Sequence, residues 1–517
     1  MKTQKTRVRR YVWTILLVFT AAGTITHAQM PVTTWHYDNA NSGANTNETI
    51  LTPQNVNPTR FGKLFSQQVD GAIIGQALYL PAVTIAGSAH NVVYVATMHD
   101  SVYAFDADSN AGTNANALWH TSFVSKGVQP MPIALQGCGG TSDWTEVGIV
   151  STAVIDPVSG TLYVVAKTYE NTKSFVHRLH ALDVTTGLEK AGSPVVIAAS
   201  YEYNGENIVF VDKMQVNRPA LRLSNGNLYI AFGSNGCRSG KEEGWVMAYN
   251  AATLQPVGAF NDEPTSSAAA VWQRGGGLAI DSEGAIYAAT ADGPFSAGVD
   301  FGESIFKLTQ GDGTLDLADW FTPWNEADLN SRDQDLSQPV LILPDQTGPY
   351  PHLAAGVGKE GTIYLLNRDS MGQFCSSCQS MDTQIPQELQ LAAPHTGALI
   401  YWNNAIYTTG NSAPILALPF VNGVIGVKAL AQSKKVSGGH SPIISSNGSS
   451  NGILWQLNGQ DLCAFNATTL VELYKSAKAH NHQDALPKLP HFANIMVNNG
   501  KLYVGTDSSL FVYGLLQ

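Results

Sequence analysis

Short segments in which apolar and polar residues alternate recur along most of the chain. In each, an apolar strand leads through a tight turn into a second strand that ends in small polar residues. The eight repeats begin, in order, VVYVATMHDSVYAFDAD at Val92, TLYVVAKT at Thr161, NLYIAFGS at Asn227, AIYAATAD at Ala285, HLAAGVGKEGTIYLL at His352, AIYTTGNSAPILAL at Ala405, ILWQLNGQDLCAF at Ile453 and KLYVGTDSSLFVYGL at Lys501. A repeat of roughly 50 to 70 residues with this pattern is typical of radial β-sheets. The pattern predicts an all-β chain folded as an eight-bladed β-propeller.

The two ends of the repeat array predict how the ring closes. The last repeat stops at Gln517, before a fourth strand, whereas FGKLFSQQVDG from Phe61 precedes the first repeat and has the pattern of a strand. We expect residues 61–69 to pair with 510–515 and to complete the last blade, because closure removes exposed sheet edges. Residues 29–517 are then a single propeller domain.

The first 28 residues have the pattern of an export signal. A basic segment from Lys2 to Arg10 precedes an apolar run over 11–22 and the small-residue site Thr26-His27-Ala28. We expect cleavage after Ala28 and a periplasmic or secreted protein that does not span a membrane. The alternative is an uncleaved anchor, but the apolar run is shorter than the ~20 residues that a span requires.

Composition and charge narrow the range of partners. The chain carries a formal net charge of -11, and only 13% of its residues are charged. Nucleic-acid binding requires clustered Lys and Arg, which the body of the chain lacks, so this class of function is excluded.

The five cysteines are an odd number and do not predict a disulfide framework. Cys375 and Cys378 lie in FCSSCQ, where Gln379 stands in place of the His that covalent haem attachment requires. They form either a small local disulfide or two thiols. Cys138 in QGCGG and Cys237 in SNGCR lie in similar contexts, and their pairing across the top of the propeller is a hypothesis.

The longest insertions between strands fall at 127–146, 235–244, 292–303 and 320–339. If all blades run in the same sense, these loops reach the same end of the propeller and converge near its axis. Long loops on a rigid scaffold are where a binding or catalytic surface is expected.

The repeats also resemble those of a known family. YVATMHDSVYAFDAD, followed by Leu118-Trp119, resembles the repeat of quinoprotein alcohol dehydrogenases, and WHYDNANSGANTNETILTPQNVNPTRFGKLF from Trp35 is similar to their N-terminal segment. The resemblance covers nearly the whole mature chain. It is strongest to an exported bacterial subgroup of pyrroloquinoline quinone (PQQ)-like repeat proteins without assigned activity. It implies PQQ and calcium as cofactors.

The resemblance also implies cofactor-binding residues. VWQRGGG places Trp272 at the aromatic floor under the quinone, and Asp292 stands where the family has an asparagine ligand of calcium. Glu242 and Glu243 are candidates for the glutamate ligand, although their offset differs from that of the family. Hard oxygen ligands suit calcium, and a flat ring suits a planar quinone. The alternative is that Trp272 is a core aromatic and Asp292 a turn residue.

The same comparison implies the residues of the chemical step. FTPWNEADLNSRDQDLSQPVL resembles the stretch that holds the catalytic aspartate, so Asp333 and Asp335 are the candidate bases. VGKEGTIYLLNR places Lys359 at the cation that contacts the cofactor and polarises its carbonyl. The adjacent cysteine pair that covers PQQ in many of these enzymes is missing, since QGCGG has one Cys.

Histidines suggest a second metal site only weakly. His480, His482, Asp484 and His491 could chelate a metal, but a solvated loop is favoured because the run lacks the further His of known sites. We expect His440 and His36 to be hydrogen-bonded turn residues.

Two functions therefore remain. The first is a calcium- and PQQ-dependent dehydrogenase that oxidises a small alcohol or sugar and passes electrons to a separate acceptor. The second is a non-enzymatic scaffold or binding module of the cell envelope, whose partner would be another envelope protein. Against the second, Gln29 follows the expected cleavage site, where such modules usually carry a lipid-anchoring Cys.

Overall fold

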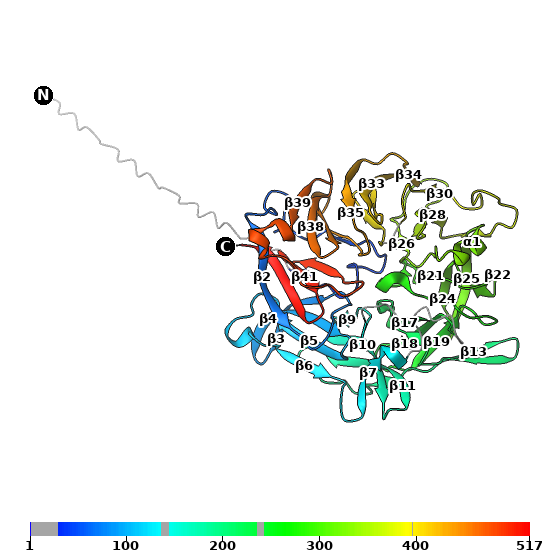
Figure 1. The fold of residues 1–517 in the computed structure, drawn as a ribbon, viewed down its shortest axis with the longest axis horizontal. Coiled ribbons are helices and arrows are strands. Elements are labelled where there is room, and N and C mark those ends of the chain that lie inside the picture. Colours follow the sequence, from blue (N-terminus) through cyan, green and yellow to red (C-terminus); the bar gives the residue numbers. More distant parts are fainter. Residues whose placement is uncertain (2–28, 136–143, 235–241, 395–396, 517) are drawn as a thin grey trace.

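The computed structural model describes residues 1, 29–135, 144–234, 242–394 and 397–516. In these residues, eight sheets of four to six strands stand around a common axis, and Figure 1 shows the ring face-on. The prediction of an eight-bladed propeller is confirmed. Within the described part, α1 (Glu326–Ser331) is the sole α-helix. The expected export signal lies almost wholly outside the described residues.

The first four blades are built from β3 to β29. Blade 1 contains β3 (Leu78–Ile85), β4 (Ser88–Thr97), β5 (Ser101–Asp106) and β6 (Trp119–Ser122); blade 2 contains β7 (Val128–Pro132), β8 (Glu146–Val147), β9 (Val154–Asp156), β10 (Thr161–Glu170), β11 (Ser174–Asp183) and β12 (Val195–Val196). Blade 3 contains β15 (Gln215–Val216), β16 (Arg222–Ser224), β17 (Asn227–Ser234), β18 (Trp245–Asn250) and β19 (Pro256–Asn261); blade 4 contains β20 (Ala279–Ile280), β21 (Ile286–Ala289), β24 (Ile305–Gln310), β25 (Leu315–Thr322) and β29 (Gln373–Phe374).

The other four blades include both ends of the chain. Blade 5 contains β26 (Leu341–Ile342), β27 (Leu353–Val357), β28 (Thr362–Asn367) and β30 (Gln387–Gln390); blade 6 contains β31 (Ile400–Trp402), β32 (Ala405–Thr409), β33 (Ala413–Val421), β34 (Val424–Ile425) and β35 (Ala431–Val436). Blade 7 contains β1 (Ala44–Asn45), β36 (Ile443–Asn447), β37 (Ser450–Asn458), β38 (Asp461–Asn466) and β39 (Glu472–Lys475); blade 8 contains β40 (Ile495–Asn498), β41 (Lys501–Gly505), β42 (Ser509–Leu515) and β2 (Phe61–Gln68). Two hairpins project from the ring: β13 (Ser200–Tyr203) with β14 (Glu206–Val209), and β22 (Phe295–Ser296) with β23 (Asp300–Phe301).

Closure of the ring follows the sequence prediction. β2 pairs antiparallel with β42, from Phe61 opposite Leu515 to Gln68 opposite Ser509. An N-terminal strand therefore forms the outer edge of the last blade.

Each blade packs on both of its neighbours. Among the described residues, a separate apolar cluster fills each of the eight interfaces between adjacent blades. Stability is thus distributed around the ring as a series of nearest-neighbour contacts.

The tyrosine of the repeat connects one blade to the next. We count the four main strands of each blade from the axis outward. In four blades, the hydroxyl of the tyrosine on the second of these strands donates a hydrogen bond to a carbonyl just after the third strand of the following blade. The pairs are Tyr94 with Val184 at 3.1 Å, Tyr163 with Ala251 at 2.9 Å, Tyr407 with Ala467 at 3.0 Å, and Tyr503 with Ala107 at 3.3 Å. Buried tyrosines need a partner for their hydroxyl, which explains why the tyrosine and the turn recur together.

The segment 32–48, here called the belt, runs along the inner strands of the blades in order. Its backbone bonds join Val32 to Tyr79, Thr33 to Ile155, Asn39 to Ile280, Ala40 to Ile342, Ser42 to Tyr401, Gly43 to Ile444 and Glu48 to Ser446. The Asn39 side chain donates to Leu223 O at 3.0 Å in blade 3, and the Glu48 carboxylate accepts from Gly500 N at 2.9 Å in blade 8. The belt thus contacts all eight blades and pairs groups on strand edges that would otherwise face the channel.

Two buried arginines explain why glycines follow Arg274 in the run 275–277. A Cβ on Gly275 would lie 2.1 Å from Arg218 Nη1, and one on Gly277 would lie 2.2 Å from Arg222 Nε. Arg222 donates to Leu278 O at 2.9 Å and also to the belt, at the Trp35 carbonyl and the Asn41 side chain. The glycines therefore leave room for guanidinium groups on the axis.

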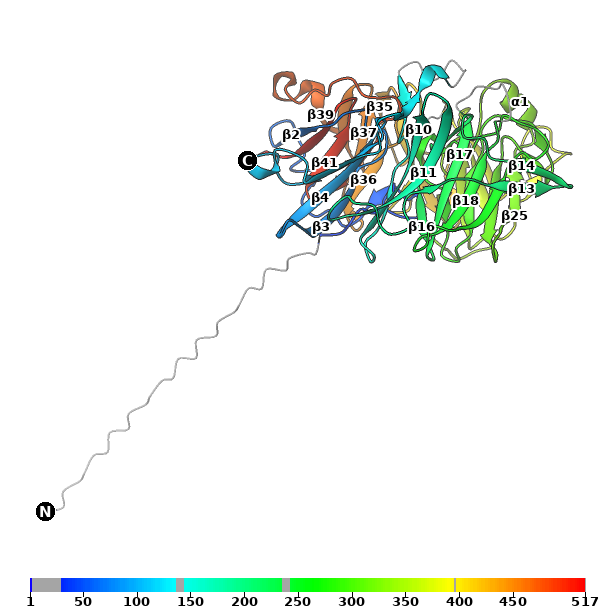
Figure 2. The same ribbon diagram turned by 90° about the horizontal axis from the view of Figure 1, so that it is seen from below.

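The antiparallel order of the strands separates the two ends of the ring. The turns 98–100, 290–304 and 358–361 and the connections 262–278 and 323–340 lie on the same face, here called the loop face. In the side view of Figure 2, α1, which belongs to the connection 323–340, lies at the upper edge of the ring. Of the four long insertions expected at one end of the ring, 292–303 and 320–339 lie on this face as predicted. Much of the other two, 136–143 and 235–241, lies outside the described residues.

The structure describes three of the five cysteines. Cys375 and Cys378 form a disulfide, which decides between the two alternatives left open by the sequence. Cys463 is a buried thiol. Cys138 and Cys237 lie outside the described residues. No helix in the part of the chain that the structure describes has the length and apolarity needed to cross a membrane.

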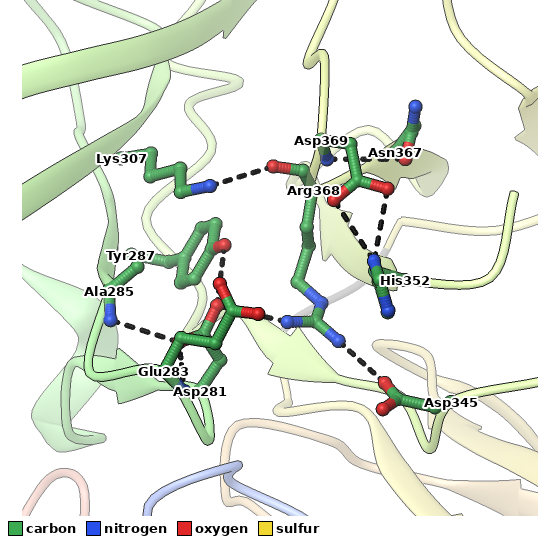
Figure 3. Close-up of polar contacts among 10 residues, drawn as sticks. All are labelled: Asp281, Glu283, Ala285, Tyr287, Lys307, Asp345, His352, Asn367, Arg368 and Asp369. Atoms are coloured by element: carbon green, nitrogen blue, oxygen red, sulfur yellow. Dashed lines mark hydrogen bonds and ion pairs between the residues drawn. The ribbon is translucent and has the colours of Figure 1, made fainter.

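On the far face, opposite the loop face, Arg368 joins blades 4 and 5 (Figure 3). Its guanidinium lies 2.9 Å from Asp281 Oδ2 and 2.9 Å from Asp345 Oδ1, and the Tyr287 hydroxyl donates to Asp281 at 2.9 Å. Arg368 and Asp281 are both buried. Arg368 is therefore a structural residue.

Replacing Arg368 by Met should destabilise the fold by about 3 to 5 kcal/mol, because the buried Asp281 carboxylate loses its countercharge. Thermal and urea unfolding measure the effect. Arg332→Ala is the control, since its ion pair with Asp328 is exposed and should contribute less than about 1 kcal/mol. Equal losses in the two variants would contradict the assignment.

Replacing Asn41 by Ala tests the belt. The Asn41 amide donates to Gly277 O at 2.8 Å and to Val340 O at 2.9 Å, and its oxygen accepts from Arg222, all in buried surroundings. We expect a loss of about 2 to 4 kcal/mol in unfolding experiments, because several buried polar groups lose partners together. Asn110→Ala, at an exposed position, should change stability by less than about 0.5 kcal/mol.

Candidate functional site

Three aspartates meet where blades 4 and 5 join on the loop face. Asp292 comes from the turn 290–304, and Asp333 and Asp335 come from the connection 323–340. One carboxylate oxygen of each lies within 4.8 Å of the others. Clustered carboxylate oxygens are ligands that hard cations prefer, so this group could hold a metal ion.

Lys359 joins the cluster from the turn 358–361 of blade 5. Its Nζ lies 2.8 Å from Asp333 Oδ1 and 2.9 Å from Asp335 Oδ2, and its backbone amide donates to Asp335 O at 3.0 Å. Burial raises the pKa of Asp335, and Lys359 opposes this shift. Burial alone would lower the pKa of Lys359, but Asp335 and Asp333 hold it above its ordinary value. The ammonium group therefore stays charged between a buried and an exposed carboxylate.

Glu303 lies beside this group and was missed by the sequence reasoning. Leu336 N donates to its Oε2 at 3.2 Å. Burial, reinforced by the neighbouring Asp335 and Asp292, raises the pKa of Glu303 to about 9, so its carboxyl is neutral at pH 7. The one sequence signal was its position at the end of the insertion 292–303.

Trp272 is half-buried, and its neighbours come from several blades rather than from two adjacent sheets, which places it near the axis. It packs in an apolar cluster drawn from several blades, which includes Ile74, Met98, Met131, Trp144, Val216 and Phe492. Its ring is edge-on to Phe492 at 6.3 Å, and the Arg218 guanidinium lies 5.9 Å from its centroid.

Two arginines surround the same aromatic group. Arg218 lies 4.7 Å and Arg274 lies 5.1 Å from the Phe492 centroid. Burial, and then the charge of Arg274, lower the pKa of Arg218 to about 9. Burial lowers the pKa of Arg274 as well, and the charge of Asp335 opposes it. This electrostatic coupling connects the axial group to the aspartate cluster.

Glu242 and Glu243 are buried near blade 3. Asn261 Nδ2 donates to Glu243 Oε2 at 3.3 Å. The group of three carboxylates found among the described residues contains neither glutamate. Their role as ligands beside Asp292, which the resemblance implied, stays a prediction.

A second feature missed by the sequence reasoning is the adjacent buried pair Asp262 and Glu263. Burial is the main cause of the raised pKa of both carboxyls. The charges of Glu243 and Asp300 raise the pKa of Asp262 further, and those of Asp262 and Asp300 raise the pKa of Glu263. Neither oxygen of Asp262 has a hydrogen-bond partner among the described residues. A Cβ on Gly244 would lie 2.0 Å from Asp262 Oδ2, so glycine is required there.

The favoured interpretation of the histidine-rich run, a solvated loop, is wrong for Asp484. This side chain is buried; it accepts a hydrogen bond from the Tyr474 hydroxyl at 2.7 Å and another from Lys63 N at 3.0 Å. It thereby attaches the connection between blades 7 and 8 to β39 and β2. His482 and His491 are exposed.

The two remaining histidine expectations are confirmed. His440 is confirmed as a hydrogen-bonded turn residue, since its Nδ1 lies 3.1 Å from Ala493 O. His36 is also a hydrogen-bonded turn residue, because its backbone amide donates to Gln76 Oε1 at 3.2 Å. Its ring nitrogen Nδ1 has no hydrogen-bond partner in the described part of the chain. Its ring instead stacks on Trp35 at 3.3 Å.

Comparison with known proteins identifies the fold. No family model and no curated protein sequence matches the chain. Among solved structures, the chain is similar to the quinohemoprotein alcohol dehydrogenase of Comamonas testosteroni, with 13% identity over 94% of this chain and 80% of that chain and a TM-score of 0.61. It is also similar to the quinohemoprotein alcohol dehydrogenase ADHIIG of Pseudomonas putida HK5, with 13% identity, the same coverages and a TM-score of 0.62. A europium-containing methanol dehydrogenase matches with 11% identity over 94% of this chain and 98% of that chain and a TM-score of 0.61.

The chain has the quinoprotein dehydrogenase fold. The resemblance inferred from the repeats is confirmed at this level. At such identities the match concerns the fold alone.

The buried pair gives a pH prediction. Because the pKa of Asp262 is raised in the folded state, its stabilising contribution is fully present below the ordinary Asp pKa of about 4 and is lost as the pH rises. Asp262→Asn should therefore become more stable than the natural protein as the pH rises from 4.5 to 7.5, by up to about 1.4 kcal/mol per pH unit. Unfolding midpoints measured across this range check it. Asp312→Asn, at an exposed turn, controls for the change in net charge, and a gap that shrinks with pH would contradict the assignment.

Proposed function

We propose that this protein is an exported calcium- and PQQ-dependent dehydrogenase of small alcohols or sugars. The observation that carries the proposal is the meeting of Asp292, Asp333, Asp335 and Lys359 on the loop face, electrostatically coupled to the arginine and tryptophan group on the axis. The fold match and the sequence resemblance support the choice of chemistry.

The aspartate cluster fits a hard cation. Asp292 and Asp335 are the more buried members and would hold the ion, since carboxylate oxygens suit calcium. The Asp at position 292 adds charge where the family has a neutral asparagine. One of the structurally similar proteins is a europium-containing methanol dehydrogenase. The binding test should therefore include a trivalent lanthanide ion as well as calcium.

The axial group fits a planar anion. PQQ carries carboxylates on a flat ring system, and Trp272 with Arg218 and Arg274 offers an aromatic face beside two cations. When bound, PQQ supplies the quinone carbonyl that accepts hydride. The cations would orient and retain it on the axis.

The two candidate bases differ in their surroundings. Asp335 Oδ1 accepts from Ser337 at 2.6 Å and Oδ2 contacts Lys359, so both of its oxygens are engaged. Asp333 is the more exposed residue and contacts Lys359 through Oδ1. We therefore assign proton removal from the substrate hydroxyl to Asp333 Oδ2 and positioning to Lys359.

Cofactor uptake tests the proposal. Purified protein mixed with PQQ and calcium, or with a trivalent lanthanide ion, should retain quinone absorbance through gel filtration. Asp292→Ala should weaken this uptake at least about 100-fold, because a charged ligand is lost. Asp333→Asn should keep uptake but lower turnover about 10²- to 10⁴-fold, and Lys359→Ala should impair turnover more than binding.

Asp316→Ala is the matched control at an exposed carboxylate away from the cluster. If the natural protein takes up no PQQ with either ion, and Asp292→Ala behaves like it in every assay, the protein is instead a binding or scaffold module of the envelope.

A further inference from the structure

The disulfide between Cys375 and Cys378 lies in a surface loop that follows β29. Residues 375–381, here called the disulfide loop, are all exposed or half-buried. Cys378 N donates to Cys375 O at 3.2 Å, and the S–S bond closes the same turn. Disulfides that solvent reaches exchange with external thiols more readily than buried ones, because the attacking thiolate needs access to a sulfur atom. The position of this disulfide therefore permits exchange with a dithiol.

Cys463 is the other cysteine that the structure describes, and it has the opposite surroundings. It is fully buried in the interface between blades 6 and 7. Burial raises the pKa of its thiol to about 12, so at neutral pH the group is neither charged nor accessible. Exchange requires a thiolate that can reach its partner. Cys463 therefore stays unreactive while the fold is intact.

Asp382, directly after the disulfide loop, anchors it to a neighbouring segment. The side chain is 2% exposed. Trp324 N donates to Asp382 Oδ1 at 3.1 Å and to Oδ2 at 3.3 Å, and Gln384 Nε2 donates to Oδ1 at 2.9 Å. The hydroxyl of Thr383, the next residue, lies 3.5 Å from Cys378 Sγ. The disulfide thus constrains the backbone that holds Asp382 against Trp324.

Trp324 begins the connection that carries part of the aspartate cluster, and α1 follows it. In α1, Asn330 Oδ1 accepts a hydrogen bond from Gly293 N at 3.2 Å, next to Asp292. Asp333 N donates to Asn330 O at 3.4 Å just after the helix. α1 therefore joins the segment of Asp292 to that of Asp333, and the anchor of the disulfide loop lies at its start.

The other end of the disulfide loop contacts the same two segments. Phe374, which precedes the loop, has its ring centroid 5.0 Å from that of Phe295 in the turn 290–304. In the parallel pair of β25 and β29, Phe374 lies opposite Thr322, immediately before the connection 323–340. Both ends of the loop therefore support the segments that carry the aspartate cluster.

We propose that Cys375–Cys378 is a thiol–disulfide exchange site and that its reduction by a dithiol loosens the segments 290–304 and 323–340. A thiolate of the dithiol forms a bond to one sulfur as the Cys375–Cys378 bond breaks, and the second thiol of the dithiol then displaces this mixed disulfide. The protein gains two electrons and two protons as two thiols, and the dithiol becomes a disulfide. Loss of the cross-link increases the conformational freedom of the loop. The anchor at the start of α1 is then held less firmly.

Thiol labelling and deuterium exchange test the proposal. The natural protein is treated with dithiothreitol without denaturant, alkylated and analysed by mass spectrometry for each cysteine. Cys375 and Cys378 should be labelled, whereas Cys463 should stay unlabelled because the fold is intact. In the same samples, the backbone amides of 290–304 and 323–340 should exchange at least about threefold faster after reduction, because local opening becomes easier.

Two variants separate the disulfide from other effects of the dithiol, since the chain has five cysteines. Cys375→Ser/Cys378→Ser should show the faster exchange of 323–340 without dithiol and no response to it. Asp382→Ala, with the disulfide intact, should show the faster exchange as well, because the anchor is lost. Ser376→Ala is the matched control within the loop and should behave like the natural protein.

Ion binding gives the consequence for the candidate site, and only this part rests on the proposed function. Terbium luminescence measures the affinity of the aspartate cluster, which should fall about three- to tenfold on reduction because the carboxylates lose support. If the oxidised protein binds no terbium, the proposed ion site fails, while labelling and deuterium exchange still decide whether the disulfide controls the two segments.

The proposal is overturned if the disulfide resists dithiothreitol in the folded protein, or if it is reduced without any change in 290–304 and 323–340. It is also overturned if the double variant still responds to the dithiol, which assigns the effect to another cysteine, or if terbium binds equally to the oxidised and reduced forms.

Discussion

The open inner edges of the eight blades are the constraint on which the rest of this structure depends. The inner strand of a propeller blade has unpaired backbone groups on the side that faces the channel, and each such group buried without a partner costs free energy. The belt 32–48 supplies partners to every blade in turn before the chain forms β2 at the outside of blade 8. One N-terminal segment therefore lines the ring from inside and closes it from outside.

This arrangement makes the two ends of the channel different. Near the belt, Arg222 and Trp35 fill the axis with groups that are hydrogen bonded or stacked, and the glycines 275–277 permit their approach. Toward the loop face the side chains are Trp272, Phe492, Arg218 and Arg274. Arg218 donates to two backbone carbonyls, but its Nε has no hydrogen-bond partner in the described residues. Cations beside aromatic rings are thus found toward the loop face, at the end away from Arg222 and Trp35.

The fold could be predicted from the sequence because its signals are local and repeated. The Tyr on the second strand and the turn after the third strand recur together in four of the blades. The pairing of the segment 61–69 with 510–515 follows from counting strands. The belt could not be predicted, since it has no alternation of apolar and polar residues and its partners are spread over the whole chain. Asp292, Asp333, Asp335 and Lys359 were identified through resemblance. Glu303, Asp262 and Glu263 were missed because each resembles an ordinary polar residue at the end of a strand, and their burial arises only when loops of different blades converge.

Buried acids are concentrated on the loops of blades 3 to 5, whereas the apolar contacts that stabilise the fold lie between the blades. Asp262, Glu263 and Glu303 are buried with raised pKa values, so at neutral pH their carboxyls retain protons rather than charge. Burial of such groups costs free energy unless protons or a cation neutralise them. The apolar contacts between blades and the hydrogen bonds of the belt stabilise the ring and offset this cost. A loop face made of costly polar groups is therefore compatible with a stable fold because the ring, and not the loops, holds the blades together.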